Sequence, residues 1–67
     1  MAKILHNYAF TFQYREVKNG ELKTERFIID SYDPDITNAC EIEMLRFVKK
    51  HDYYSAILTK ATELYKD

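Results

Sequence analysis

The sequence contains one cysteine, one glycine, one proline and no tryptophan, and the scarcity of cysteine and that of glycine each exclude a class of protein. A single cysteine cannot form an internal disulfide, which excludes a small secreted domain stabilised by disulfides. One glycine is too few for a loop that cradles phosphates, which excludes the common nucleotide-binding motifs. Two histidines and one cysteine show no spacing typical of a zinc site. We therefore expect neither a cofactor nor a bound metal.

The chain also lacks a dominant charge and a long hydrophobic run. Its net charge is −1, so it has neither the basic excess of a nucleic-acid binder nor the acidic excess of a DNA mimic. Residues 1–5 lack the apolar run of a signal peptide, and no stretch approaches membrane-spanning length. With 67 residues, 46% hydrophobic and 31% charged, the composition is typical of one small soluble domain over residues 1–67. We expect a cytoplasmic protein with no membrane partner.

What the chain does have is an Asn19-Gly20 pair between two segments of alternating polarity. Asn-Gly is typical of a two-residue type I′ turn, in which both residues adopt positive φ. That turn would pair Phe12 with Phe27 across the two strands. Strand side chains alternate between faces, so one face of the hairpin is aromatic and aliphatic while the other is mostly polar. The pattern predicts an antiparallel β-hairpin over about residues 4–32.

The segment after the hairpin predicts a helix over about residues 34–50. Asp33 is a good N-cap, Pro34 suits the first helical position, and the last turn is cationic. Ala39 and Ile42 lie off the main apolar stripe, so apolar residues cover more than half of the circumference. The C-terminal segment or another chain could cover the second side. The main stripe is expected to lie on the aromatic face of the hairpin, and it consists of Ile36, Cys40, Met44, Phe47 and Val48.

The C-terminal segment, residues 53–66, fits two interpretations. As a helix, it places apolar side chains on one stripe at spacings of three and four residues. As a strand, it places Ala56, Leu58 and Leu64 on one face, although polar residues such as Lys60 interrupt that face. Periodicity favours a second helix, whereas a hairpin alone is marginal and gains stability from a third β-strand. Both interpretations stay open, and the fold class is α+β in either case.

The residues that could carry chemistry each have a structural explanation. Cys40 lies on the apolar stripe of the predicted helix, and His51 lies about 16 Å farther along it, too far to act as its base. Asp30, Asp33 and Asp35 lack the glycine and the distal glutamate of a calcium loop. Helix capping and solvation explain these carboxylates instead. We expect no enzymatic activity.

The two faces of the hairpin also allow two interpretations each. The aromatic face could stack nucleic-acid bases, but such platforms are accompanied by basic residues and glycines, and a core beneath a helix needs the same rings. The polar face carries Arg15 and Arg26, which the predicted pairing brings close together. Two arginines can grip phosphates or the carboxylates of a partner. A solvated sheet face is the simpler explanation.

Six tyrosines are the remaining functional signal. Tyrosine combines an apolar body with a polar tip and is enriched in interfaces. An unpaired hairpin edge is a template for pairing with another chain, so a homodimer is a further option. The polar face, the second apolar side of the helix and the tyrosines together give a candidate interaction surface, which consists of Gln13, Arg15, Thr24, Arg26, Tyr32, Ile42, Tyr53 and Tyr54.

These observations predict a small non-enzymatic module that binds a protein partner and modulates or inhibits it. Its size suits an accessory protein of the kind that phages and mobile elements encode. The alternative is a nucleic-acid-binding module that uses the face carrying Arg15 and Arg26.

Overall fold

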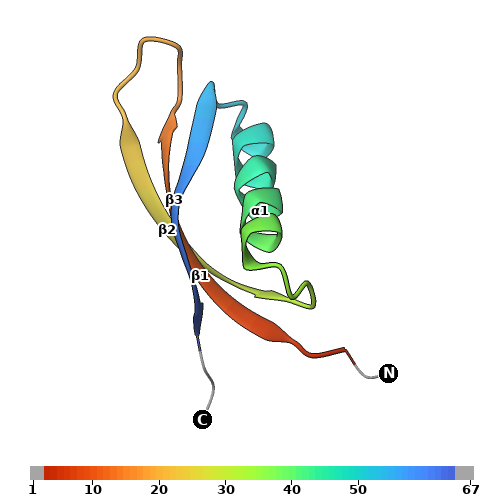
Figure 1. Cartoon of the computed structure of the whole chain (residues 1–67). Coiled ribbons are helices and arrows are strands. Elements are labelled where there is room, and N and C mark those ends of the chain that lie inside the picture. Colours follow the sequence, from red (N-terminus) through yellow and green to blue (C-terminus); the bar gives the residue numbers. More distant parts are fainter. Residues whose placement is uncertain (1–2, 65–67) are drawn as a thin grey trace.

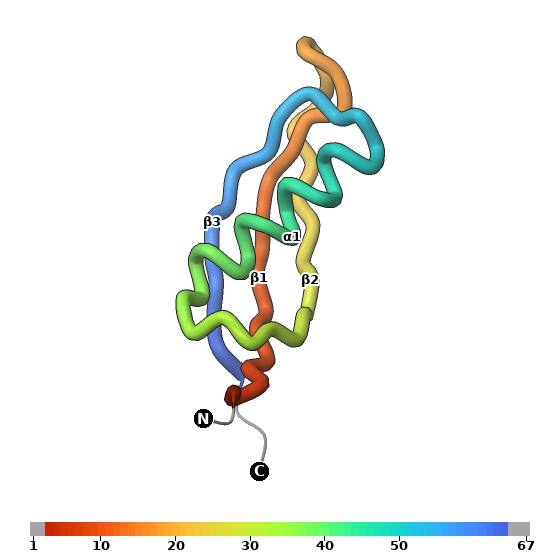
Figure 2. Tube along the Cα trace, turned by 90° about the vertical axis from the view of Figure 1, so that its right-hand side faces the viewer, coloured from red at the N-terminus to blue at the C-terminus, as the bar shows by residue number. Residues whose placement is uncertain are grey.

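A computed structural model describes residues 3–64 of the chain. A three-stranded antiparallel sheet in the order β2-β1-β3 carries one helix on one of its faces (Figure 1). The helix crosses the sheet diagonally, from β3 where it begins toward β2 where it ends (Figure 2). The fold is therefore α+β. The elements are, in chain order, β1 (His6–Arg15), β2 (Lys23–Ser31), α1 (Ile36–His51) and β3 (Ser55–Leu64).

The predicted hairpin is present, but its predicted register is wrong by two residues. Phe12 lies opposite Glu25, and Phe27 lies opposite Phe10. Because the shift is an even number of residues, every side chain keeps the face that alternation assigned to it. The aromatic and polar faces of the hairpin are therefore those expected from the sequence.

The observed register differs from the predicted one because the connection between β1 and β2 is longer than a two-residue turn. The type I′ prediction is wrong, since neither Asn19 nor Gly20 has a positive φ. The Gly20 N–H instead donates to the Val17 carbonyl at 2.9 Å and closes a turn within residues 16–22. A Cβ at Gly20 would lie 2.9 Å from Val17 Cγ2 and 3.1 Å from the Val17 carbonyl oxygen. The presence of glycine at position 20 is therefore explained by the close approach of its backbone to Val17 and not by a left-handed backbone conformation.

The helix begins two residues later than predicted, because Asp35 and not Asp33 is its N-cap. The Asp35 carboxylate accepts the Asn38 N–H at 3.2 Å. The Asp33 carboxylate accepts the Asp35 N–H at 2.9 Å and the Asn38 side-chain amide, and these bonds lower the pKa of Asp33. Pro34 therefore lies in the connection rather than in the first turn.

The end of the helix agrees with the expected cationic last turn. Lys49, Lys50 and His51 occupy that turn, where positive charge complements the free carbonyls. Asp52 takes the left-handed conformation, and the Tyr53 N–H donates to the Val48 carbonyl at 3.0 Å. No helix within residues 3–64 combines the length and the apolar character needed to cross a bilayer.

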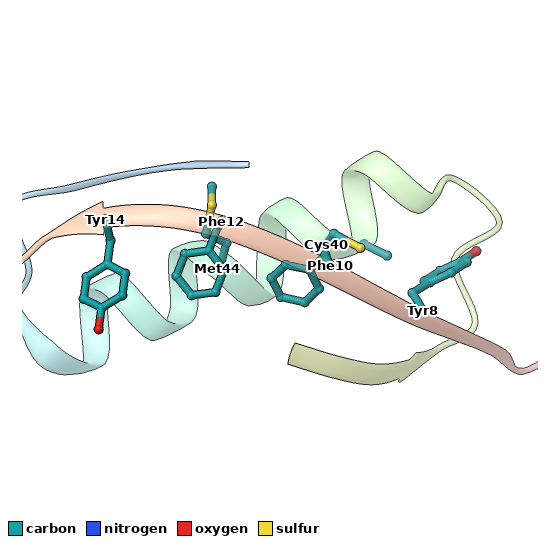
Figure 3. Close-up of a cluster of buried hydrophobic side chains, with 7 residues drawn as sticks. Tyr8, Phe10, Phe12, Tyr14, Cys40 and Met44 are labelled. Atoms are coloured by element: carbon teal, nitrogen blue, oxygen red, sulfur yellow. The ribbon is translucent and has the colours of Figure 1, made fainter. Parts of the chain in front are cut away.

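The core lies between α1 and the aromatic face of the sheet, as predicted. Four rings of β1 stand in a row beneath the helix, and the side chains of Cys40 and Met44 meet them from above (Figure 3). Ala39, which lies off the main stripe, is buried as well, in agreement with the option that the C-terminal segment covers the second side of the helix. The sheet is one strand wider than the predicted hairpin, and the added strand, β3, covers the second apolar side of the helix, on which Ala39 lies. The four rings belong to Tyr8, Phe10, Phe12 and Tyr14.

The C-terminal segment is a strand, the second of the two interpretations, and it pairs with β1. Its pattern looked irregular because the pairing shifts between Thr11 and Phe12, which leaves Thr59 as the extra residue of a β-bulge. Leu58 and Ala61 consequently both pack against the core although three positions separate them. Residues 65 and 66 of the predicted segment lie outside the described residues.

Candidate functional site

One face of the sheet carries α1, and no described element covers the other (Figure 1). This uncovered surface, called the open face below, shows every second side chain of each strand. Ile28 on β2 and Ile57 on β3 lie on it and are 56% and 63% exposed. The remaining side chains of the open face are mostly polar, and they are Asn7, Ala9, Thr11, Gln13, Arg15, Thr24, Arg26, Asp30, Ser55, Lys60, Thr62 and Leu64.

The bulge in β3 determines which side chains reach the open face. Lys60 pairs with Thr11 and therefore shares its face. Without the extra residue, continued alternation from Leu58 would turn Lys60 toward the core. The Thr59 hydroxyl donates to the Thr11 carbonyl at 3.0 Å and links the two strands beside the bulge. The irregularity thus brings a cation onto the uncovered surface.

A shallow groove of about 210 Å³ runs across the middle of the open face. Ala9 is 5% exposed, and its small side chain leaves a hollow between the larger side chains of the neighbouring strands. The groove is lined by Ala9, Thr11, Arg26, Lys60, Thr62 and Leu64. Hydroxyl groups and two cations therefore surround a small apolar floor.

The two cations of the groove are Arg26 and Lys60, which lie opposite Thr11 on its two sides. Within residues 3–64 neither forms an ion pair or a side-chain hydrogen bond. Lys23 pairs with Glu16 at 2.7 Å and Arg46 with Glu43 at 3.0 Å. Several other cations of the described chain also lack a partner, and these are Lys3, Lys18, Lys49 and Lys50. The fold therefore leaves the charges of Arg26 and Lys60 free for a ligand.

The structure brings only part of the predicted interaction surface together. Gln13, Thr24 and Arg26 share the open face. Arg15 has the same parity, but its Nη1 donates to the Gly20 carbonyl at 2.9 Å. Its predicted closeness to Arg26 is wrong, because Arg26 pairs with Thr11, four residues or about 13 Å from Arg15 along β1.

The other predicted interaction residues lie elsewhere. Tyr32 is exposed in the connection after β2, and Ile42 is exposed on the helix. Tyr53 belongs to the core, where its ring stacks on Tyr14 at 5.2 Å between centroids. Tyr54 is exposed, and its N–H donates to the Arg15 carbonyl at 2.9 Å. Ile42 on the helix and Tyr53 in the core therefore do not belong to the open face.

A larger hollow of about 440 Å³ lies at the end of the sheet near the start of β1. Its lining groups His6 and Asp33 have partners within the chain, whereas the Lys3 ammonium and the Tyr32 hydroxyl have none among residues 3–64. His6 Nδ1 lies 2.7 Å from a Glu63 carboxylate oxygen, and the buried Tyr8 hydroxyl donates to the Asp33 carbonyl at 2.7 Å. Burial raises the pKa of Tyr8. Among residues 3–64, this hollow thus has one unpaired cation and one unpaired hydroxyl, whereas the groove has two of each. It is lined by Lys3, Ile4, His6, Tyr32, Asp33 and Pro34.

Cys40 has no access to solvent from its place between the helix and the sheet. Burial raises the pKa of its thiol. It therefore packs as a small apolar side chain, as the sequence pattern suggested.

Sequence reasoning left Ile28 out of the surface, although alternation along the hairpin places it on this face, and it missed the β3 residues Lys60, Ile57 and Thr62. A strand interpretation of residues 53–66 with one bulge would have placed all three on the polar side. The run from Leu58 to Ala61, with polar residues between two apolar ones, is the only signal for that bulge.

Comparison with known proteins gives no further guide, since no family model, no curated protein and no solved structure matches the chain.

Proposed function

We propose that the protein is a small non-enzymatic module that binds a protein partner through the open face and modulates or inhibits that partner by occupying its surface. The observation that carries this proposal is the exposure of Ile28 and Ile57 on regular strand positions of an uncovered sheet. These two large apolar side chains lie on the two edge strands with the groove and its cations between them, so apolar contact area and polar donors share one face. This mixture is typical of protein interfaces.

A nucleic-acid partner, the alternative prediction, has less support. The rings that could stack on bases are buried beneath α1. Asp30 lies on the same face as Arg26, and Arg15 donates to its own loop. A line of cations that follows a phosphate backbone is therefore absent from the described part of the open face.

The cytoplasmic setting and the dimer remain proposals as well. The single cysteine is a buried free thiol, which suits a reducing compartment. β2 and β3 are the edges of the sheet and could pair with another chain. The bulge in β3 and the charged side chains of β2 both weaken such pairing, so the open face is favoured over an edge.

The experiment is affinity capture from the native host with three forms of the protein. These are the unaltered chain, a variant with Ile28→Ser and Ile57→Ser, and a control with Ile42→Ser and Leu45→Ser on the helix. All four side chains are exposed, so the folds should be equally stable. We expect the same partner with the unaltered chain and the control, and its loss with the open-face variant. Equal capture by all three would refute the proposal, and chromatography of the purified chain detects self-association.

A further inference from the structure

The groove on the open face has the chemistry of a carboxylate-binding site. Arg26 and Lys60 approach it from opposite edge strands, with Thr11 of the central strand between them. Two interstrand spacings separate their backbones by roughly 10 Å. Both side chains are long enough to reach a group bound above Thr11 from either side. The hydroxyls of Thr11 and Thr62 add further donors at the same place.

We infer, given the proposed function, that the partner inserts an acidic side chain of an Asp- or Glu-bearing segment between Arg26 and Lys60. A guanidinium and an ammonium form short, charge-assisted hydrogen bonds to a carboxylate. Both cations lack a partner among the described residues, so binding breaks no existing ion pair. The groove floor at Ala9 provides the space for the acidic group.

The surroundings of the groove specify what flanks the carboxylate. Ile28 lies on β2 two residues from Arg26, and Ile57 pairs with Gln13 two residues from Thr11. Two residues along a strand correspond to about 7 Å. Ile28 and Ile57 also lie one strand, about 5 Å, to either side of Thr11, so the partner segment presents an acidic group with apolar side chains about 8 Å away in two opposite diagonal directions.

A second copy of the chain does not fit this surface. If two open faces met around a twofold axis that passes through the groove, the Arg26 and Lys60 of one copy would lie against the same cations of the other. Like charges across an interface weaken association and select against that pairing. Charge complementarity thus favours an acidic partner over self-association.

The test is an NMR titration of the full isotope-labelled chain with the short peptide Val-Ser-Glu-Ser-Val, which in an extended conformation places one valine on each side of the carboxylate and on the same face. The same peptide with Gln in place of Glu is the control for charge. We expect shift changes at Thr11, Arg26, Lys60 and Thr62 that saturate below about 5 mM and weaken with added salt. The Gln peptide should leave these signals unchanged. No change at the groove, or equal changes with both peptides, would overturn the inference.

Variants identify the two cations as the cause. Arg26→Glu with Lys60→Glu should weaken binding of the Glu peptide about tenfold or more. Lys18→Glu with Arg46→Glu makes the same change in net charge away from the groove and should leave binding unchanged. Arg26→Gln with Lys60→Gln serves as the second test pair if charge reversal disturbs folding. Equal weakening by the groove and control pairs would contradict the assignment.

Two further outcomes separate this inference from the proposed function. A DNA or RNA oligonucleotide could bind more tightly than the Glu peptide and lose that binding in the Arg26/Lys60 variant. That result would show that the groove binds a phosphate backbone and not a carboxylate. If the Glu peptide does not bind but the Ile28/Ile57 variant still loses the captured partner, the assignment of the groove as a carboxylate site is wrong, and the proposed protein-binding function is retained. If capture does not depend on these isoleucines, the proposed function itself fails.

Discussion

Ile28 and Ile29 are neighbours in the chain, yet they lie on opposite faces of one sheet and have different environments. Ile29 packs against the core beneath α1, whereas Ile28 is 56% exposed. Ile57 and Leu58 on β3 repeat the contrast, with Ile57 exposed and Leu58 in the core. The comparison teaches that one face of this small sheet supplies the core and that the other exposes large apolar side chains, with no covering element among residues 3–64.

The two faces also differ in the kind of side chain they carry. The covered face contains interlocking rings, with Phe12 contacting Phe27 and Phe47 edge to face at 5.3 Å between centroids in both pairs. Such pairs stabilise the core beyond the burial of their area. The open face carries hydroxyls and cations without partners in the described chain. Substitutions on the two faces should therefore separate stability from binding.

The largest expected effect is that of removing a ring from the covered face. Phe12→Ala removes a fully buried side chain and should cost about 3–5 kcal/mol of the free energy of unfolding. A domain of this size has little more than that in total, so the variant should be largely unfolded. Urea denaturation followed by circular dichroism measures the loss. Ile57→Ala on the open face should cost less than about 0.5 kcal/mol, and equal losses would remove the distinction between the faces.

The next effect concerns the cap that starts the helix over the covered face. Asp35→Ala removes the acceptor of the Asn38 N–H and should lower the free energy of unfolding by about 1 kcal/mol. Glu21→Ala, an exposed position in the loop between β1 and β2, is the control and should change it little. If Asp35→Ala is as neutral as the control, the assignment of Asp35 as the N-cap is wrong.

A smaller effect should appear on acidification. The Asn38 amide and the Asp35 N–H hold the pKa of Asp33 below its usual value, so the unfolded chain takes up a proton at that carboxyl more readily than the folded chain. Its stabilising contribution is complete above a pH of about 4 and is lost as the pH falls through the lower folded pKa. Urea midpoints measured between about pH 5 and pH 2 should fall less steeply for Asp33→Asn than for the unaltered chain. Identical slopes would show that Asp33 does not contribute.

The smallest effect on stability is expected for the groove itself. Arg26→Gln with Lys60→Gln should change the free energy of unfolding by less than about 0.5 kcal/mol, because neither side chain has a partner within the described residues. Arg15→Gln should cost more, about 1 kcal/mol, since it removes the bond to the Gly20 carbonyl. A large loss on changing the groove cations would mean that they belong to the fold and are not free for a ligand.

Much of this architecture was predictable because it follows from local patterns. Alternation along β1 assigns its rings to one face, and that assignment survived an error of two residues in the register. The helix position follows from the break at Asp33 and Pro34. The register itself was not predictable, because Asn19-Gly20 suggests a two-residue turn and only the contact between Gly20 and Val17 shows the longer one.

The candidate surface was less predictable than the fold. Three of its residues, Gln13, Thr24 and Arg26, follow from the alternation of the hairpin. The contributions of Ile57 and Lys60 depend on pairing between β1 and β3, which are distant in the sequence, and on a bulge at Thr59. A bulge breaks the period of two on which strand prediction relies. Whether a charged side chain such as Arg26 or Lys60 has an ion-pair partner can be seen only in the folded structure.

The central claim is that the open face is free in the isolated protein and covered in its complex. Methyl NMR with a soluble paramagnetic agent measures this directly, because the agent broadens signals in proportion to their access to solvent. The account predicts strong broadening of the Ile28 and Ile57 methyl signals, weak broadening of Ile29 and Leu58, and recovery of the first two when the captured partner is added. Equal protection of all four residues in the free protein, or no recovery in the complex, would contradict it.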